Sequence, residues 1–161
     1  MYYELISPIL FFNFLTVFIG FFLYWGKVEG DQELDNNCKL FDGDTFGFFT
    51  NLCGEQLWMT QYDMSVTAVL IGLQVLTSMS AFVYTFWFQR PTREFINIIM
   101  IQITFPMISG GIGIIWYESS TENFKYNDLI NYSFTIGPVL AMTSAIINLL
   151  MILLMVFEKI K

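Results

Sequence analysis

The chain has 161 residues, of which 55% are hydrophobic and only 13% charged, and its mean hydropathy is +0.58. Soluble domains carry about 25% charged residues, so this composition excludes an ordinary soluble domain. The formal net charge of −7 argues against nucleic acid as a partner.

Four long runs of the sequence contain no charged residue. Each reaches the roughly 20 residues that a helix needs to cross about 30 Å of hydrocarbon. Backbone polar groups in lipid must be satisfied within their own segment, so these runs are expected to be helices. We predict an all-α membrane protein, a four-transmembrane-helix bundle in a single membrane domain covering residues 1–161. The predicted helices are residues 7–25, 64–88, 95–117 and 131–157.

The first run is predicted to be a retained helix and not a cleaved signal peptide. No basic residue precedes it, because the chain starts Met1-Tyr2-Tyr3-Glu4. Tyr24 and Trp25 end it, and aromatic rings of this kind prefer headgroup depth. We therefore expect these two side chains to lie at the membrane interface.

The distribution of charge predicts the orientation of the helices. Basic residues concentrate in cytoplasmic segments, and here they occupy the short turn 89–94 and the C-terminal residues. Both termini and this turn are expected to be cytoplasmic, and the predicted outer loops 26–63 and 118–130 to face outward. The basic residues that set this orientation are Arg90, Arg93, Lys159 and Lys161. The first outer loop is acidic, with Glu29, Asp31, Glu33, Asp35, Asp42, Asp44, Glu55 and Asp63.

Cys38 and Cys53 are the only cysteines, and both lie in the first outer loop. Two cysteines on one outward loop favour a disulfide, with two free thiols as the alternative. Closing a loop of this size is worth roughly 3 kcal/mol in the chain-entropy model. Two thiolates without further ligands nearby do not predict a metal site.

The same loop has the pattern of a β-hairpin. Asp42-Gly43 is a favourable turn between Leu40-Phe41 and Phe46-x-Phe48-Phe49. We therefore predict a short β-ribbon that the disulfide pins. The alternative, a calcium site at Asp42-Gly43-Asp44, does not have the spacing of an EF-hand.

Residues that could carry chemistry are scarce. The chain has no histidine, which removes the commonest general base and metal ligand. The predicted spans carry no acid or base, so a proton relay within the membrane is not expected. We predict no catalytic residues, no metal and no cofactor.

Neutral polar and small residues within the spans are expected to serve helix packing. Ser109-Gly110-Gly111-Ile112-Gly113 gives the third helix a smooth face, and Pro106 and Pro138 are expected to kink a helix or mark its start. Asn131-Tyr132-Ser133 is a sequon, so Asn131 is a candidate glycosylation site. The neutral polar residues expected to hydrogen-bond between helices are Asn13, Gln74, Asn97, Gln102 and Asn148.

This plan resembles the claudin-like tetraspans, namely claudins, the peripheral myelin protein group and stargazin-type gamma subunits. Trp25 is similar to the tryptophan that begins their first loop, and Gly54-Glu55-Gln56-Leu57-Trp58 to their Gly-Leu-Trp element. That element precedes both cysteines in the family but follows Cys53 here. Further similar segments are Ile114-Ile115-Trp116-Tyr117, Phe124-x-Tyr126-Asn127 and Tyr132-Ser133-Phe134-x-x-Gly137.

The resemblance implies a protein of the plasma membrane that works by protein–protein contact, as a channel or receptor auxiliary subunit or a cell-junction component. Its first loop would form a small sheet over the bundle, and its partners would be lipid and other integral membrane proteins: a channel, a receptor or a like tetraspan. The alternative is an accessory structural subunit of a large organellar complex of the respiratory type, in the mitochondrial inner membrane. The residues expected to contact a partner are Phe41, Phe46, Phe48, Phe49 and Trp58.

Overall fold

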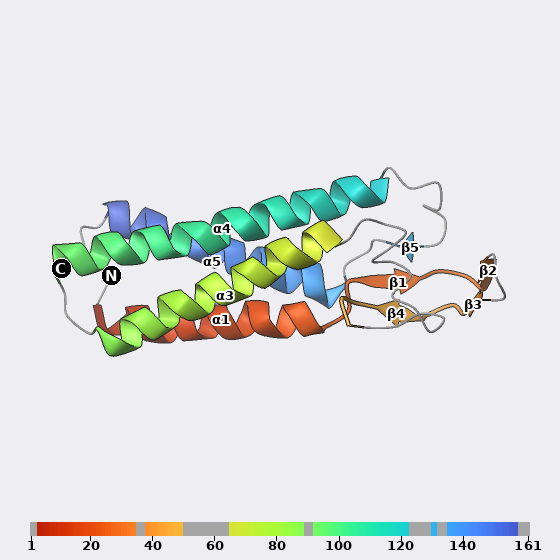
Figure 1. Ribbon diagram of the computed structural model, residues 1–161, viewed down its shortest axis with the longest axis horizontal. Helices are drawn as coiled ribbons and strands as arrows, with labels where there is room; N and C mark the ends of the chain where they lie inside the picture. Colours follow the sequence, from red (N-terminus) through yellow and green to blue (C-terminus); the bar gives the residue numbers. More distant parts are fainter. Residues whose placement is uncertain are drawn as a thin grey trace.

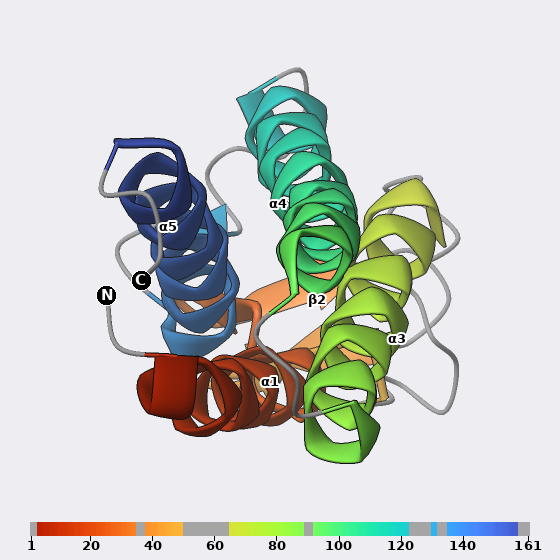
Figure 2. The same cartoon turned by 90° about the vertical axis from the view of Figure 1, so that its left-hand side faces the viewer.

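The described residues form a bundle of four long helices with a small β-sheet at one end (Figure 1). Helix α1 contacts α3 and α5, and α4 also contacts α3 and α5, so the helices form a closed ring seen end-on in Figure 2. The helices are α1 (Ile6–Phe22), α3 (Ser65–Trp87), α4 (Arg93–Glu122) and α5 (Ile136–Phe157), and a 3-10 helix, η1 (Tyr3–Leu5), precedes α1. The computed structural model describes residues 3–34, 38–49, 65–88, 92–122, 130–131 and 135–157.

The prediction of four helices in a bundle is confirmed. Within the described ranges, three of them, α3, α4 and α5, are long and apolar enough to cross a membrane. Helix α1 is a shorter apolar helix of 17 residues. These properties indicate an integral membrane protein.

The predicted ends of three helices differ from the structure. Helix α1 ends at Phe22 and not at 25, and α5 begins at Ile136 and not at 131. Helix α4 continues to Glu122, beyond the predicted end at 117. Charge-free runs show which segments of the chain are apolar, but they do not show where helical hydrogen bonding ends. Pro138 lies in the first turn of α5, where a proline is tolerated, so it marks the start of that helix.

The interior of the bundle contains neutral polar side chains among apolar ones, whereas its exterior is apolar. Asn13, Gln74, Ser144 and Asn148 are each no more than 1% exposed, whereas Phe105 is 61% exposed. The Asn13 Nδ2 donates to Asn148 Oδ1 at 2.7 Å, and Gln74 Nε2 donates to the Ala141 carbonyl at 3.1 Å. The predicted hydrogen bonds between helices are therefore present for these three residues. Asn97, in contrast, is exposed on the surface of α4.

The small-residue face of α4 packs as predicted. A Cβ added at Gly110 would lie 2.5 Å from the Gln74 side chain, and one at Gly113 would lie 2.9 Å from Ile71. Ser109 Oγ donates to the Leu70 carbonyl at 2.5 Å. Side chains larger than glycine would push α3 and α4 apart here.

Segments from both outer loops build the small sheet. In β1 (Gly26–Val28), Lys27 pairs with Thr45 of β4 (Thr45–Phe46) and with Asn131 of β5 (Ile130–Asn131), antiparallel on both sides. A two-stranded extension joins β2 (Gln32–Leu34) to β3 (Cys38–Leu40). The ribbon expected in the first loop is present, and it shares its sheet with the second loop.

The predicted turn of the ribbon is in the wrong place. The strands before and after Asp42-Gly43 do not pair with each other, because β3 pairs with β2 and β4 with β1. Asp42-Gly43 is instead a bulge in the returning arm, where Gly43 has φ +92° and its N–H donates to the Val28 carbonyl at 3.0 Å. Glycine adopts this positive φ without steric strain. A hairpin turn requires glycine for the same reason, so the sequence pattern fits both structures.

Candidate interaction surface

Trp25 joins the sheet to the bundle. Its side chain is fully buried, and its Nε1–H donates to the Gly20 carbonyl at 3.0 Å. Its backbone N–H donates to the Phe46 carbonyl at 2.7 Å, and its own carbonyl accepts from the Tyr117 hydroxyl and from Thr135 Oγ1. One residue thus ties together α1, β4, α4 and the segment before α5. Because the Trp25 ring is buried within the protein, it does not face lipid headgroups, whereas the adjacent Tyr24 is 47% exposed.

An aromatic cluster fills the space between Trp25 and the sheet. The Trp25 ring lies 4.7 Å from the Phe48 ring and 5.2 Å from the Tyr117 ring, which meets it edge-on at 83°. Phe48 also lies 5.2 Å from Phe21 of α1. Such ring pairs are worth about 0.5–1.5 kcal/mol each beyond their burial. The sheet therefore stands on the end of the bundle in a fixed position.

Two glycines permit the close approach of these elements. A Cβ at Gly26 would lie 1.9 Å from Phe46 Cζ, and one at Gly137 would lie 2.6 Å from Trp25 Nε1. The Gly137 N–H donates to the Tyr24 carbonyl at 2.9 Å, which brings the start of α5 against the end of α1.

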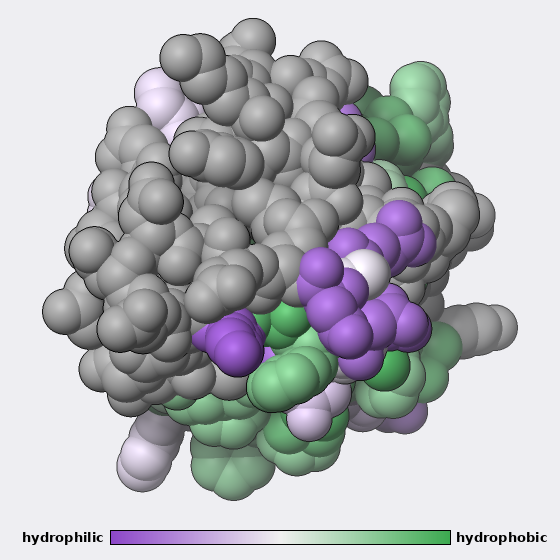
Figure 3. Space-filling model, turned by 90° about the vertical axis from the view of Figure 1, so that its right-hand side faces the viewer, coloured by the Kyte–Doolittle hydropathy of each residue, from purple (hydrophilic) through white to green (hydrophobic). Residues whose placement is uncertain are grey.

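Acidic side chains connect the two arms of the ribbon at the bulge. Asp42 Oδ1 accepts from the Gly30 N–H at 3.0 Å, and Asp31 Oδ1 accepts from the Asp42 N–H at 2.9 Å. Asp44 Oδ2 accepts from the Phe41 N–H at 2.9 Å. The Asp31 and Asp42 carboxylates thus replace missing ladder hydrogen bonds between the two arms, whereas the Asp44 carboxylate bonds within its own arm. Figure 3 looks onto this end of the molecule, where the described residues include a hydrophilic patch beside apolar side chains.

The acidic residues at the bulge bind backbone N–H groups. Among the described residues, no group of three or more His, Cys, Asp or Glu side chains is placed to hold a metal ion. The carboxylates of Asp31, Asp42 and Asp44 instead accept backbone hydrogen bonds, so their geometry has a structural cause.

The structure narrows the set of predicted contact residues. Phe41 and Phe49 are 59% and 57% exposed, but Phe46 and Phe48 are buried beneath the sheet at 2% and 3%. Phe49 stacks on Phe22 at 4.9 Å, so its ring lies against the outer end of α1. Of the phenylalanines predicted to make contact, Phe41 alone is exposed on the ribbon itself. Trp58 lies outside the described residues.

The predicted disulfide and the predicted glycosylation site both depend on side chains that the structure does not describe. Cys38 begins β3, but its side chain and all of Cys53 lie outside the described parts of the chain. Asn131 lies in β5, where its backbone is in register with Lys27, and its side chain is likewise not described. Both remain predictions.

Comparisons with protein families, with characterised proteins and with solved structures find no match to this chain. The function must therefore be argued from the residues themselves. Sequence reasoning missed Tyr117 and Gly137 as parts of the Trp25 junction, although both lie in segments that carry the claudin resemblance.

Proposed function

We propose that this protein crosses the membrane four times and acts without catalysis, by contact between its outer sheet and another integral membrane protein. The observation that carries the proposal is the attachment of the sheet to the bundle: Trp25 fixes it to α1, to α4 and to the segment before α5, and its outward face is left for recognition. A loop with no role outside the bundle would not need such an anchor.

The chemistry of the outward face favours a basic partner surface. Phe41 is exposed next to the carboxylates of Asp42 and Asp31, and Glu29 is also exposed. An aromatic face near carboxylates suits Lys or Arg side chains, which gain both ion pairing and cation–π attraction. Exposed aromatic rings are also frequent anchors of protein interfaces.

The sheet formed from both loops also supports the claudin-like interpretation, in which the first loop does the recognising. A channel or receptor auxiliary subunit, or a junction component of the plasma membrane, is the role that we favour within it. The alternative role, in a respiratory-type organellar complex, uses the same kind of contact but a different membrane. Imaging of the tagged chain separates them: plasma-membrane signal supports the first, and mitochondrial signal supports the second.

The contact is tested by purification in mild detergent and native mass measurement. The wild-type chain is expected in an assembly larger than its own 18.7 kDa. Phe41→Ser should release it from that assembly, while Lys39→Ser, at an exposed position on the same ribbon, is the matched control. A lone wild-type monomer, or equal loss with both variants, would contradict the proposal.

The four crossings are tested by single cysteines introduced at Glu4, Glu29 and Thr92, with the unsubstituted chain as background. Labels at Glu4 and Thr92 should react from one side of the membrane and the label at Glu29 from the other. Reaction of Glu4 and Glu29 from the same side would show that α1 does not cross.

A further inference from the structure

Two apolar clusters occupy the interior of the bundle, and a polar layer lies between them. The cluster nearer the sheet includes Val17 of α1, Ile71 of α3, Ile114 of α4 and Ala141 of α5. The cluster at the opposite end includes Leu10, Ala81, Ile103 and Met151 of the same four helices. We call the residues between these two sets the polar layer. Its buried polar side chains are Asn13, Thr16, Gln74, Ser78, Ser144 and Asn148.

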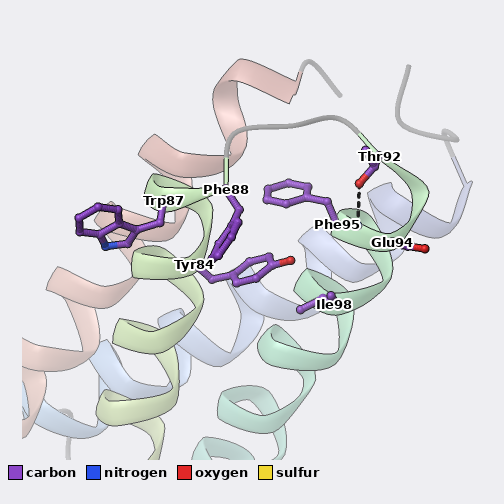
Figure 4. A pocket seen from close by; sticks show the side chains of 7 residues that line it. All are labelled: Tyr84, Trp87, Phe88, Thr92, Glu94, Phe95 and Ile98. Atoms are coloured by element: carbon purple, nitrogen blue, oxygen red, sulfur yellow. Dashed lines mark hydrogen bonds between the residues drawn. The ribbon is translucent and has the colours of Figure 1, made fainter.

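The polar layer is separated from both ends of the bundle. On the side of the sheet, the apolar cluster includes the buried rings of Trp25 and Phe48. At the opposite end, Tyr84 stacks on Phe95 at 5.5 Å. Figure 4 shows these two rings between α3 and α4, where they line a pocket of about 610 Å³. The buried polar side chains of the layer are each at most 9% exposed, so the layer is an enclosed site.

The two serines of the layer lack the hydrogen bond that other helical hydroxyls make here. Thr16, Thr77 and Thr104 donate to the carbonyl four residues earlier in their own helix, at 2.9, 2.6 and 2.6 Å. A hydroxyl without a better partner makes this bond, because lipid offers no other acceptor. Ser78 Oγ and Ser144 Oγ are buried and have no partner among the described residues. Both hydroxyls are therefore available to a molecule inside the layer.

The amides of the layer also have unpartnered atoms. The bond between the two asparagines uses Asn13 Nδ2 and Asn148 Oδ1, so within the described chain Asn13 Oδ1 and Asn148 Nδ2 have no partner. Gln74 Nε2 donates to a carbonyl of α5, and Gln74 Oε1 has no partner there either. Thr67 Oγ1 and Gln102 Oε1 are likewise unpartnered but lie outside the layer. Each such group costs about 1–3 kcal/mol when it is buried, so a bound polar molecule would be stabilising.

Helix geometry places the unpartnered atoms close together in depth. Helices α3 and α5 lie opposite each other in the ring of helices and run in the same direction (Figures 1 and 2). The hydrogen bond from Gln74 to Ala141 shows that these two residues are at the same depth. Ser78 and Ser144 follow them by four and three residues, so both serines lie about one turn, or 5.4 Å, further from the sheet. Asn148 lies about one turn beyond Ser144.

The side chains at the depth of the serines are small. Gly110 of α4 lies beside Gln74, and Pro106, one turn before it, is buried at about the depth of the serines. On α1, Thr16 lies about one turn from Asn13 and is also buried. Serine, proline and threonine thus meet where leucine, isoleucine and methionine fill the interior further from the sheet. This difference in size leaves room for a small molecule between the helices.

We propose that the polar layer binds ordered water molecules. One water bridges Asn13 Oδ1 and Asn148 Nδ2. A second donates to Gln74 Oε1 and bonds to the hydroxyls of Ser78 and Ser144. Water matches this site because the unpartnered atoms include both acceptors and a donor. A metal cation would meet the Asn148 N–H, an anion would meet amide oxygens, and the four helices carry no charged residue between the two apolar clusters.

The test is nuclear magnetic resonance of the full chain in lipid bilayers, measuring magnetisation transfer from water to side-chain amides. The amides of Asn13, Gln74 and Asn148 are expected to receive it although they lie in the interior of the bundle. Phe105→Gln places a control amide at a similar depth on the exposed side of α4, and this amide should receive none. No transfer to the three interior amides, or equal transfer to the control amide, would overturn the proposal.

Serine variants locate the second water. A buried water makes about three hydrogen bonds, so Ser78→Ala and Ser144→Ala should each lower transfer to the Gln74 amide by roughly twofold or more. Transfer to Asn13 should not change. Ser80→Ala is the matched control, because Ser80 is exposed on α3, and it should change neither signal. Unchanged transfer to Gln74 in both layer variants, or an equal loss with Ser80→Ala, would also overturn the proposal.

Discussion

The bundle and the outer sheet differ in what they present to their surroundings. In α5, Ser144 and Asn148 are buried together with Ala141 and Met151, while the outer face is apolar and Leu150 is 53% exposed. In the sheet, Val28 and Phe46 are buried and Lys27 is exposed. Apolar groups face whichever surroundings are less polar, so the bundle is built for lipid and the sheet for water.

The bundle and the sheet meet at Trp25, so a substitution of this residue is expected to have the largest effect. Trp25→Ala removes a fully buried ring and its hydrogen bond to the Gly20 carbonyl. We expect a loss of about 3–5 kcal/mol in unfolding free energy, as for large aromatic residues in other cores. Unfolding in mixed micelles followed by circular dichroism measures it. Trp87→Ala, at a ring that is 74% exposed, is the control and should change stability little.

The lipid-facing side of the bundle gives the next largest effect. Phe105 is 61% exposed near the middle of the apolar span of α4, and Ile115 is 68% exposed near the end of the same span. Phe105→Asp should disfavour membrane insertion by about 2.5–3.5 kcal/mol, because an aspartate at the centre of a span meets hydrocarbon. Ile115→Asp should cost clearly less, since it lies near the headgroups.

Insertion of the two variants into microsomal membranes compares them directly. On a water-exposed surface both substitutions would stay within about 0.5 kcal/mol of the wild type. Equal, small effects would therefore refute the assignment of α4 as a membrane span.

Much of the bundle is predictable from the sequence because lipid imposes a simple rule. A helix must be apolar along its whole length, so four charge-free runs predict four helices. The same rule makes a neutral polar residue within a span conspicuous, and Asn13, Gln74 and Asn148 do bridge helices. The exposed Asn97 shows the limit, since helical position and not residue type decides which side a residue faces.

The sheet and its junction are less predictable because they depend on contacts between distant segments. Trp25 has the sequence context of an interfacial ring, and only the approach of Tyr117 and Thr135 buries it. Strand pairing likewise depends on which segment lies beside each strand. The sequence Asp42-Gly43 is therefore compatible with a hairpin turn and with a bulge. The sequence does not distinguish Phe46 and Phe48 from Phe41, although the first two are buried and Phe41 is exposed.

A third prediction concerns the bulge and tests the cost of a positive φ for a residue other than glycine. Gly43 has φ +92° and no atom within 4 Å of an added Cβ, so Gly43→Ala introduces conformational strain without a clash. We expect a loss of about 1–2 kcal/mol. Gly111 also has open space around it but lies within α4, so Gly111→Ala should stabilise the chain by up to about 1 kcal/mol. Destabilisation by both, in thermal unfolding, would contradict this.

The smallest expected effect comes from a comparison of a buried and an exposed asparagine in the bundle. Asn148→Leu removes the 2.7 Å hydrogen bond with Asn13 and leaves the Asn13 amide buried without it. Hydrogen bonds between membrane helices average about 0.6 kcal/mol and reach about 1.7, so a loss in that range is expected. Asn97→Leu is the matched control, because the same substitution at an exposed position exchanges a polar group for an apolar one facing lipid. It should stabilise the protein or leave it unchanged in mixed-micelle unfolding. Stabilisation by Asn148→Leu and destabilisation by Asn97→Leu would reverse the assignment of inside and outside on these two helices.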